Sequence, residues 1–388
     1  MAAMIRRSIA LAAWLVLASS AALAQGQGGG QGGGGGQGGG GGQTGGGGQT
    51  GGGGQTAGGQ QAPAPVPILT GGRTASLLRA GQVGSVDLLG IRIPDIVGDR
   101  LGPGLSSPEP LAAAPDVGGL PPAAWASLAT PAIPSWNAWV APRATWAERS
   151  HPTFGYDGLQ VGVTAGVDRR VGERAVIGVL GLYETSDFDT AGPGFLESRM
   201  GGAGLYAGAA LTDVLVADAS AFWQAGESDV GNAFARGSFD TERWAAAANL
   251  TAYLNAGLWQ VAPTLGVVWV SDRQGAYVDS LGTLSPGLTI ETTTLRGGAE
   301  VSRTFATASG ATVTPFAAVA ATWDVSRVQS PTPTPPTDDL PEGDVSLRAG
   351  MRAAPTQAVS LSLEVDVSGL ARPDYSVVTV SGRLGVRF

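Results

Sequence analysis

Cysteine is absent from the 388-residue sequence, histidine occurs once, and charged residues make up only 14% of the chain. The absence of cysteine excludes a disulfide framework and thiolate metal ligands. Beyond the N-terminus, no segment reaches the run of about 18 apolar residues that a membrane-spanning helix requires. The net charge of −8 argues against nucleic acid as a partner, because phosphate binding needs clustered lysine and arginine. We therefore expect neither helical membrane spans nor a nucleic-acid-binding role.

Candidate catalytic and metal-binding residues are few. The histidine, His151, precedes Pro152 in a predicted loop, and a Ser-His hydrolase would also need an orienting acid and an oxyanion hole. The Gly-x-Ser-x-Gly motif of many serine hydrolases does not occur. The adjacent carboxylates Asp338 and Asp339 lie in a Pro-rich loop, which favours solvation over metal binding. We expect no enzyme activity, no catalytic residue, no cofactor and no metal site.

The N-terminus has the pattern of a secretory signal peptide over residues 1–24. Arg6 and Arg7 are followed by an apolar run over 9–18 and by the small residues Ala22-Leu23-Ala24. The apolar run is too short to span a membrane, although a retained N-terminal anchor is the alternative. The pattern predicts export of the chain from Gln25 onward.

Residues 25–61 are almost wholly glycine and glutamine. Such a segment has no apolar side chains to bury, so burial cannot offset the entropy of ordering its backbone. We expect a disordered tether, with a root-mean-square span of roughly 30 to 36 Å for a Gly-rich coil of this length. Stacked polyglycine strands in a surface layer are the alternative. The glutamines recur every six positions, at Gln31, Gln37, Gln43, Gln49 and Gln55.

Residues 62–134 are rich in proline and alanine. Within this segment, residues 76–101 carry apolar side chains without a sustained period, which predicts two short strands or a loosely packed segment. The segment is too short and too often broken by proline for an independent domain. Its position between a tether and the strands described next indicates a short passenger or a pore plug, with a disordered linker as the alternative.

From Trp136 onward, apolar and polar residues alternate in segment after segment. A period of two places successive side chains on opposite faces of a strand. The pattern predicts a twelve-stranded antiparallel transmembrane β-barrel over residues 135–388, since lipid can cover the apolar face and water the polar one. A soluble sandwich, the alternative, would use shorter strands. The predicted strands are 136–147, 159–168, 175–188, 202–209, 215–224, 243–255, 259–272, 295–302, 312–325, 344–352, 359–368 and 378–388.

Charged residues occupy the polar face of several predicted strands. In the last strand, apolar Val378, Val380, Leu384, Val386 and Phe388 alternate with polar residues, and we expect this strand to close the barrel against the first. Charges that face the lumen would keep the barrel closed and hydrated, with a selectivity filter as the alternative. These predicted lumen charges are Arg296, Glu300, Arg348, Glu364, Asp366, Arg383 and Arg387.

Turns and tryptophans also fit a membrane barrel. Short turns such as 171–174 alternate with longer connections such as 275–288, and barrels of this kind keep the short turns in the periplasm. Tryptophans near strand ends would form the interfacial girdle. The predicted girdle comprises Trp136, Trp139, Trp146, Trp223, Trp244, Trp259, Trp269 and Trp323.

Several short motifs in the strand region resemble the autotransporter β-domain, the translocator of type V secretion in Gram-negative bacteria. They are the Trp-bearing first strand Ser135-Trp136-Asn137-Ala138-Trp139, the segment 156–163, the Pro-led strands 261–266 and 313–318, the strand 295–301 between them, and the terminal Arg387-Phe388. The resemblance covers residues 135–388. Two departures are that only residues 25–134 lie between signal and barrel, and that no Asn-Asn junction precedes the first strand.

The resemblance implies a barrel in the outer membrane whose pore is crossed by the polypeptide just before the first strand. It implies outer-membrane lipid, periplasmic chaperones and the barrel-assembly machinery as partners, with Leu384, Val386 and Phe388 as the C-terminal assembly signal. The expected function is to anchor the chain and to export or display its own short N-terminal region, which would lie in the periplasm, in the pore or at the cell surface. A small-solute pore without a secretion role and a surface adhesin or structural protein are the alternatives.

Overall fold

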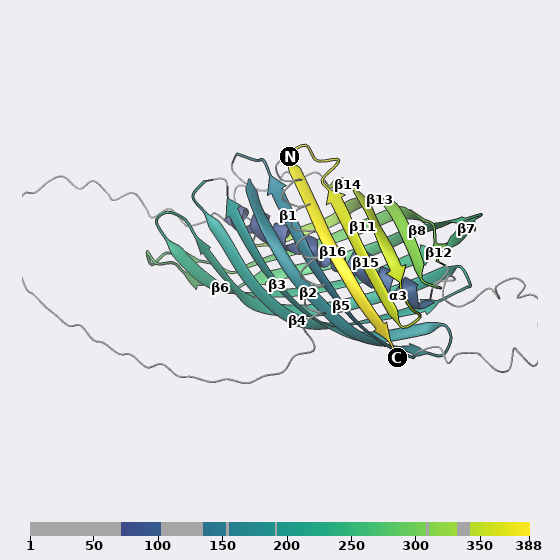
Figure 1. Cartoon of the computed structure of the whole chain (residues 1–388). Coiled ribbons are helices and arrows are strands. Elements are labelled where there is room, and N and C mark those ends of the chain that lie inside the picture. Colours follow the sequence, from purple (N-terminus) through teal and green to yellow (C-terminus); the bar gives the residue numbers. More distant parts are fainter. Residues whose placement is uncertain (1–70, 102–134, 153–154, 191, 308–309, 332–341) are drawn as a thin grey trace, which may run out of the picture. The chain divides into compact units, whose positions relative to one another are not determined.

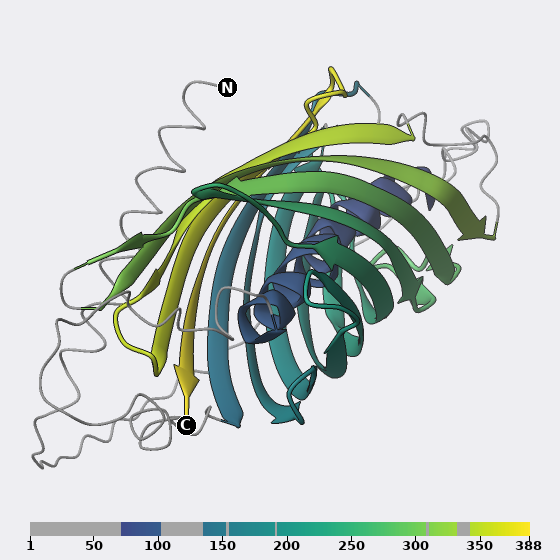
Figure 2. The same ribbon diagram turned by 90° about the vertical axis from the view of Figure 1, so that its right-hand side faces the viewer.

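The computed structural model describes residues 71–101, 135–152, 155–190, 192–307, 310–331 and 342–388. The predicted signal peptide (1–24) and the predicted tether (25–61) lie outside these ranges, and so does most of the predicted plug or passenger segment (62–134). What is described is one antiparallel β-barrel with a helix inside it (Figures 1 and 2).

Twelve long strands form the barrel in the described part of the chain. Each pairs antiparallel with two neighbours, and the ring closes through the pairs β8–β11 and β16–β1. These strands are β1 (Trp136–Arg149), β2 (Tyr156–Val171), β3 (Ala175–Thr190), β4 (Phe195–Ala210), β5 (Leu215–Gly231), β6 (Arg236–Ala252), β8 (Trp259–Gln274), β11 (Leu288–Ser302), β13 (Thr312–Ser330), β14 (Gly343–Ala354), β15 (Val359–Ser368) and β16 (Tyr375–Arg387).

Four short strands lie in the connections. β7 (Leu254–Ala256) extends the β6–β8 turn, β12 (Phe305–Ala306) pairs with β13, and β9 (Tyr277–Val278) and β10 (Leu284–Ser285) form a hairpin between β8 and β11. This hairpin marks one end of the barrel, which we call the hairpin end. The end at which β1 begins and β16 stops is called the C-terminal end.

The prediction of a twelve-stranded antiparallel barrel is confirmed, and each predicted segment coincides with one long strand. The expected closure is confirmed as well, because β16 pairs with β1 along their lengths. Three strands begin well before their predicted first residue, β4 at Phe195, β6 at Arg236 and β11 at Leu288. The side chains that point outward in these additional strand residues include charged ones, such as Glu197 and Asp240. The alternation of apolar and polar residues is therefore lost there, although the backbone pairing continues.

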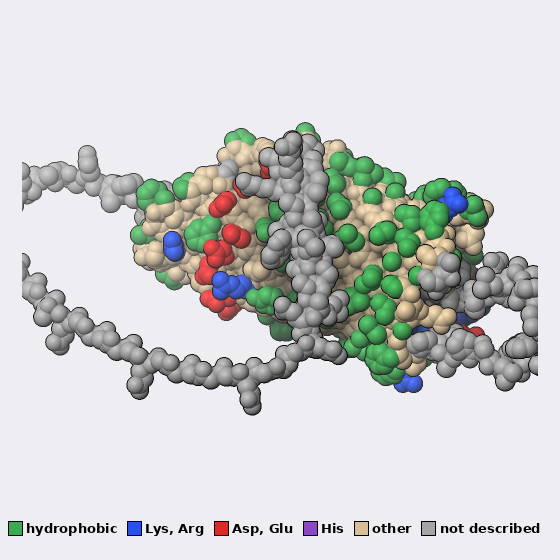
Figure 3. Space-filling model, viewed as in Figure 1, with side chains coloured by type: hydrophobic (Ala, Val, Ile, Leu, Met, Phe, Trp, Pro, Cys, Tyr) green, Lys and Arg blue, Asp and Glu red, His purple; other side chains and the backbone are tan. Residues whose placement is uncertain are grey.

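The outer face of the barrel is apolar over a broad area. The exposed fractions of outward side chains include 63% for Val179, 62% for Leu205 and 64% for Leu265. Figure 3 shows apolar side chains spread over the visible face of the barrel and carboxylates gathered toward one end. Exposure on this scale is the lipid-facing surface of a membrane barrel rather than the surface of a soluble domain.

Tryptophans mark the border between the apolar and charged zones of this face. The rings of Trp223 and Trp244 lie 6.4 Å apart, and both indole N–H groups donate to Glu242 Oε1, at 2.9 and 3.1 Å. This arrangement suits side chains at a membrane interface. The assignment of Trp139 to the girdle is wrong, because its side chain is buried in the lumen and donates to the Tyr206 hydroxyl.

The helix inside the barrel comprises α2 (Gly71–Asp87), the π-helical turn η1 (Leu88–Arg92) and α3 (Ile93–Leu101). Figure 2 shows it running along the interior of the barrel. The prediction of two short strands or a loose piece for residues 76–101 is therefore wrong. A backbone enclosed by the barrel wall must satisfy its own hydrogen bonds, and a helix does so within one segment.

No helix in the described ranges is both long enough and apolar enough to cross a membrane.

Candidate functional site

The helix has a defined direction in the lumen. Near its start, Leu77 packs with Phe188 and Phe239, which lie toward the hairpin end. At its other end, the Arg100 guanidinium donates to the carbonyl of Ser135, the residue before β1, with 3.1 Å between the atoms. The chain therefore runs from the hairpin end to the C-terminal end.

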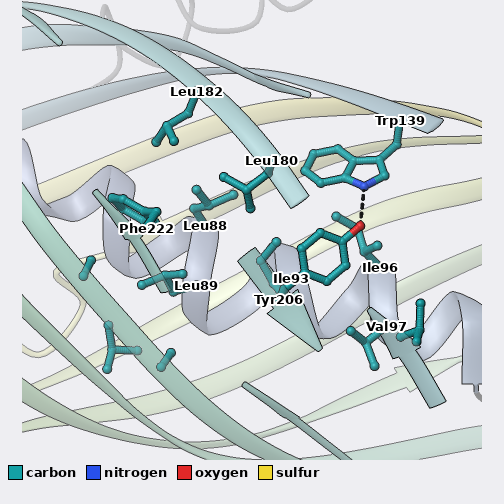
Figure 4. Packing of buried hydrophobic residues seen from close by; sticks show 14 of the residues in the cluster. Leu88, Leu89, Ile93, Ile96, Val97, Trp139, Leu180, Leu182, Tyr206 and Phe222 are labelled. Atoms are coloured by element: carbon teal, nitrogen blue, oxygen red, sulfur yellow. Dashed lines mark hydrogen bonds between the residues drawn. The ribbon is translucent and has the colours of Figure 1, made fainter. Parts of the chain in front are cut away.

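An apolar interface holds the helix against one half of the wall. Leu88, Leu89, Ile93, Ile96 and Val97 are at most 2% exposed and pack on inward side chains of β1, β3, β4, β5, β6 and β8 (Figure 4). Full burial of side chains of this size contributes about 1.5 to 3 kcal/mol each. The wall residues of this interface are Trp139, Val176, Leu180, Leu182, Tyr206, Val216, Phe222, Ala245, Ala247, Val268 and Val270.

Glycines let polar wall residues reach the helix backbone. Gln160 Nε2 donates to the Gly81 carbonyl at 3.1 Å, and Arg143 Nη1 donates to the Gly84 carbonyl at 3.0 Å. A Cβ on Gly84 would lie 2.7 Å from Arg143 Cζ, so no larger residue fits there without displacing the guanidinium. These glycines are unfavourable for an isolated helix, by roughly 1 kcal/mol each relative to alanine. They permit the close contact between the helix backbone and the wall side chains.

The π-helical turn is held in the same way. Asn249 Nδ2 donates to the Leu89 carbonyl at 3.3 Å, and Arg296 Nη1 donates to the Gly90 carbonyl at 2.8 Å. A π-turn lengthens the helical hydrogen-bond spacing and is frequent at functional sites. Here the wall supplies donors to carbonyls at this irregularity.

Charged pairs connect the second half of the helix to β11 and β14 to β16. Asp95 lies 2.8 Å from Arg348 and 3.4 Å from Arg352. Both arginines also bind Glu300, at 3.1 and 2.6 Å. The helix pairs in two further places on this side, Arg92 with Glu364 and Asp99 with Arg383.

A second charge network lies on the other side of the lumen. Glu184 of β3 accepts from Arg143 at 2.6 Å and from Arg243 at 2.7 Å, and Arg243 also binds Asp272 at 2.6 Å. All four side chains are buried. Each charge has a partner, as burial requires.

Asp168 joins the end of the helix to the wall. Its carboxylate lies 3.0 Å from Arg100 Nε, and it accepts hydrogen bonds from Tyr206 at 2.9 Å and from Asn137 at 2.8 Å. Tyr206 in turn accepts from Trp139 at 2.7 Å. This cluster fixes the point at which the helix leaves the lumen toward β1.

The structure places the seven predicted lumen charges along the β11 to β16 side. Arg296 contacts the helix at Gly90, and Glu300, Arg348, Glu364 and Arg383 take part in the pairs described above. Arg387 Nη2 lies 3.4 Å from the Asp99 carbonyl, and Asp366 accepts from Ser368 at 2.8 Å.

The predicted assembly signal lies along the seam with β1. Leu384 is opposite Val140, and Val386 is opposite Ala138. The Phe388 backbone exchanges two hydrogen bonds with Trp136, while its side chain is 66% exposed.

Five buried charged residues of the lumen were not predicted from the sequence as site residues, namely Arg143, Glu184, Arg243, Asp272 and Asp168. The only sequence signal for them was the alternation of apolar and polar residues, in which Asp168, Arg243 and Asp272 occupy polar positions of predicted strands. It could not indicate that a helix lies against them.

The family model described as the autotransporter β-domain matches residues 138–366. The translocator domain of the autotransporter NalP from Neisseria meningitidis is 13% identical, with 81% of this chain and 97% of that chain covered and a TM-score of 0.56. The β-domain of the Bordetella autotransporter BrkA is 18% identical, with 66% and 100% covered and a TM-score of 0.55. At such identities the structural likeness shows the fold alone. A search of curated proteins found no match.

Proposed function

Because this chain belongs to the autotransporter β-domain family and is an outer-membrane barrel of the Gram-negative type, we propose that it displays its own N-terminal region at the cell surface. In this proposal, residues 1–24 are a signal peptide, residues 25–61 are a surface tether and residues 135–388 are the translocating anchor. The helix between them is the part of the displayed segment that stays in the pore. The proposed role is transport and display, without an enzymatic step.

The direction of the helix carries this proposal. Gly71 begins α2 toward the hairpin end, and Leu101 ends α3 toward the C-terminal end. Barrels of this kind keep short turns in the periplasm and long connections outside. The β9–β10 hairpin belongs to such a long connection, between Gln274 and Leu288. The polarity of the helix therefore supports a surface position for the residues that precede Gly71.

Assembly would depend on the C-terminus. We propose that Leu384, Val386 and Phe388 are read by the barrel-assembly machinery after delivery by periplasmic chaperones. The apolar outward positions of β16 and its exposed terminal ring are compatible with recognition before the strand pairs with β1. Outer-membrane lipid then covers the apolar face.

The absence of cysteine gives a direct test of display. A single cysteine is introduced in turn by Gln61→Cys, by Leu281→Cys in the β9–β10 hairpin and by Asp213→Cys in the β4–β5 connection, and intact cells are treated with a membrane-impermeant maleimide. We expect Gln61→Cys and Leu281→Cys to be labelled on intact cells, and Asp213→Cys only after permeabilisation. Labelling of Gln61→Cys only after permeabilisation would contradict surface display.

A further inference from the structure

The helix fills only one side of the lumen. Most of its apolar contacts are with β1 to β8, and on its other side two cavities of about 280 and 160 Å³ lie mainly between the helix and β11 to β16. Each is large enough for several water molecules and is lined by both polar and apolar groups. The larger cavity reaches the C-terminal end, where Thr304 and Thr312 line it, and the smaller reaches toward the hairpin end, where Arg327 and Arg372 line it.

The two cavities meet at Arg296. This residue and Ser346 line both of them. The Arg296 side chain extends from β11 across the boundary to the Gly90 carbonyl, at 2.8 Å. Within the described residues it forms no salt bridge with a carboxylate, unlike Arg348 and Arg352 beside it. A long side chain that makes no direct ion pair in the described part of the chain therefore lies between the two cavities.

The charge balance of the larger cavity favours anions. Its lining carries five arginines and three carboxylates, a difference of two positive charges. Rings of arginine and lysine select anions in pores, because they attract the ion where low-dielectric walls focus the field. The lining charges are Arg296, Arg348, Arg352, Arg383 and Arg387 against Asp95, Asp99 and Glu300.

We propose that the barrel, with its helix in place, conducts small inorganic anions such as chloride along the β11 to β16 side of the lumen, and that Arg296 is the constriction that limits this flow. The path needs no movement of the helix, because the two cavities are open beside the charged pairs that join the helix to this wall. It is independent of the direction in which the N-terminal region is displayed.

The test is single-channel recording of the full mature chain in planar lipid bilayers under a KCl gradient, with KCl as the probe. We expect a small conductance whose reversal potential shows preference for chloride. Arg296→Ala should raise the conductance severalfold and weaken the preference, and Arg296→Glu should shift the reversal potential toward that of potassium. Arg296→Lys should keep the anion preference.

Arg303→Ala is the matched control, since Arg303 lies over the rings of Trp259 and Phe305 and lines neither cavity. Its conductance should equal that of the unmodified chain. A different gel mobility before and after boiling verifies that each variant is folded. The proposal is overturned if Arg296→Ala conducts as the unmodified chain does, if neither conducts, or if the unmodified chain prefers potassium. Any of these results would leave the cysteine-labelling test of display unaffected.

Discussion

Asp95 of α3 and Arg348 of β14 are 253 positions apart in the sequence, and their side chains lie 2.8 Å apart in the lumen. The pair belongs to a cluster with Arg352 and Glu300 that ties the helix to the wall opposite its apolar interface. The helix is thus held from two sides by different physical means. Burial of apolar surface acts on one side, and paired charges act on the other.

Replacing Asp95 by asparagine should destabilise the barrel. Removal of one partner from a buried ion pair costs about 3 to 5 kcal/mol, and we expect the lower part of this range because this pair is partly buried and Glu300 still pairs with both arginines. The measurement is the temperature at which the compact form is lost on gels. Asp213→Asn is the matched control, since Asp213 pairs with Arg174 on the surface and such pairs contribute about 0 to 1 kcal/mol. If both variants lost the compact form at the same temperature, a stabilising role of Asp95 would be contradicted.

Replacing Gly84 by valine should loosen the helix without opening the barrel. The added side chain would meet the Arg143 guanidinium, and overpacking of this kind costs about 1 to 3 kcal/mol. The expected result is faster proteolysis of residues 71–101 in detergent, with retained heat modifiability. Gly257→Asn is the control, because Gly257 has a φ of 64° in a turn with open space around it, which asparagine tolerates. If Gly84→Val were cleaved no faster than the unmodified protein, the close contact between Gly84 and Arg143 would be refuted.

Replacing Tyr206 by phenylalanine should lower thermal stability. The hydroxyl lies between Trp139 and Asp168, and its loss leaves a buried donor and part of a carboxylate unsatisfied, at a cost of about 1 to 3 kcal/mol. Tyr183→Phe is the matched change on the outer face, where the tyrosine is 51% exposed, and it should leave the melting temperature unaltered. A melting temperature for Tyr206→Phe equal to that of the unmodified protein would show that the cluster does not stabilise the barrel.

Replacing Phe388 by alanine should reduce the amount of assembled protein and leave the stability of the assembled fraction unchanged. Its ring is exposed, while its backbone pairing with Trp136 does not depend on the side chain. The heat-modifiable fraction of outer-membrane preparations measures assembly, and thermal melting of the purified barrel measures stability. Normal assembly of the variant would argue against an assembly signal at this position, and a lowered melting temperature would indicate a structural role instead.

The barrel could be predicted from the sequence because its pattern is local. In β15, Val359 to Ser368 alternates between apolar and polar residues, and lipid on one face and water on the other are enough to explain this. No knowledge of the partner strands is needed. The register then follows, since a slip of one residue would exchange the two faces.

The helix could not be predicted because its contact surface is defined by the wall. Gly81 and Gly84 face the wall, but a glycine carries no hydrophobic signal and lowers helix propensity. The inward Val268 and Val270 lie beside outward Val267 and Trp269, so β8 is apolar on both faces, and only a buried partner in the lumen explains this. The pairing of Asp95 with Arg348 depends on closure of the barrel, which no local pattern contains.

The most direct test of the account is a disulfide between the helix and the wall. A Cβ on Gly208 of β4 would lie 3.3 Å from the Val97 Cβ, close to the separation of about 3.5 to 4.5 Å found in disulfides. Outer membranes carrying Val97→Cys with Gly208→Cys, or Val97→Cys with Gly350→Cys on the far wall, are oxidised and analysed by gel mobility. The account predicts a cross-link in the first pair only. Absence of a cross-link in the first pair, or equal cross-linking in both, would contradict a helix docked in the lumen against β4.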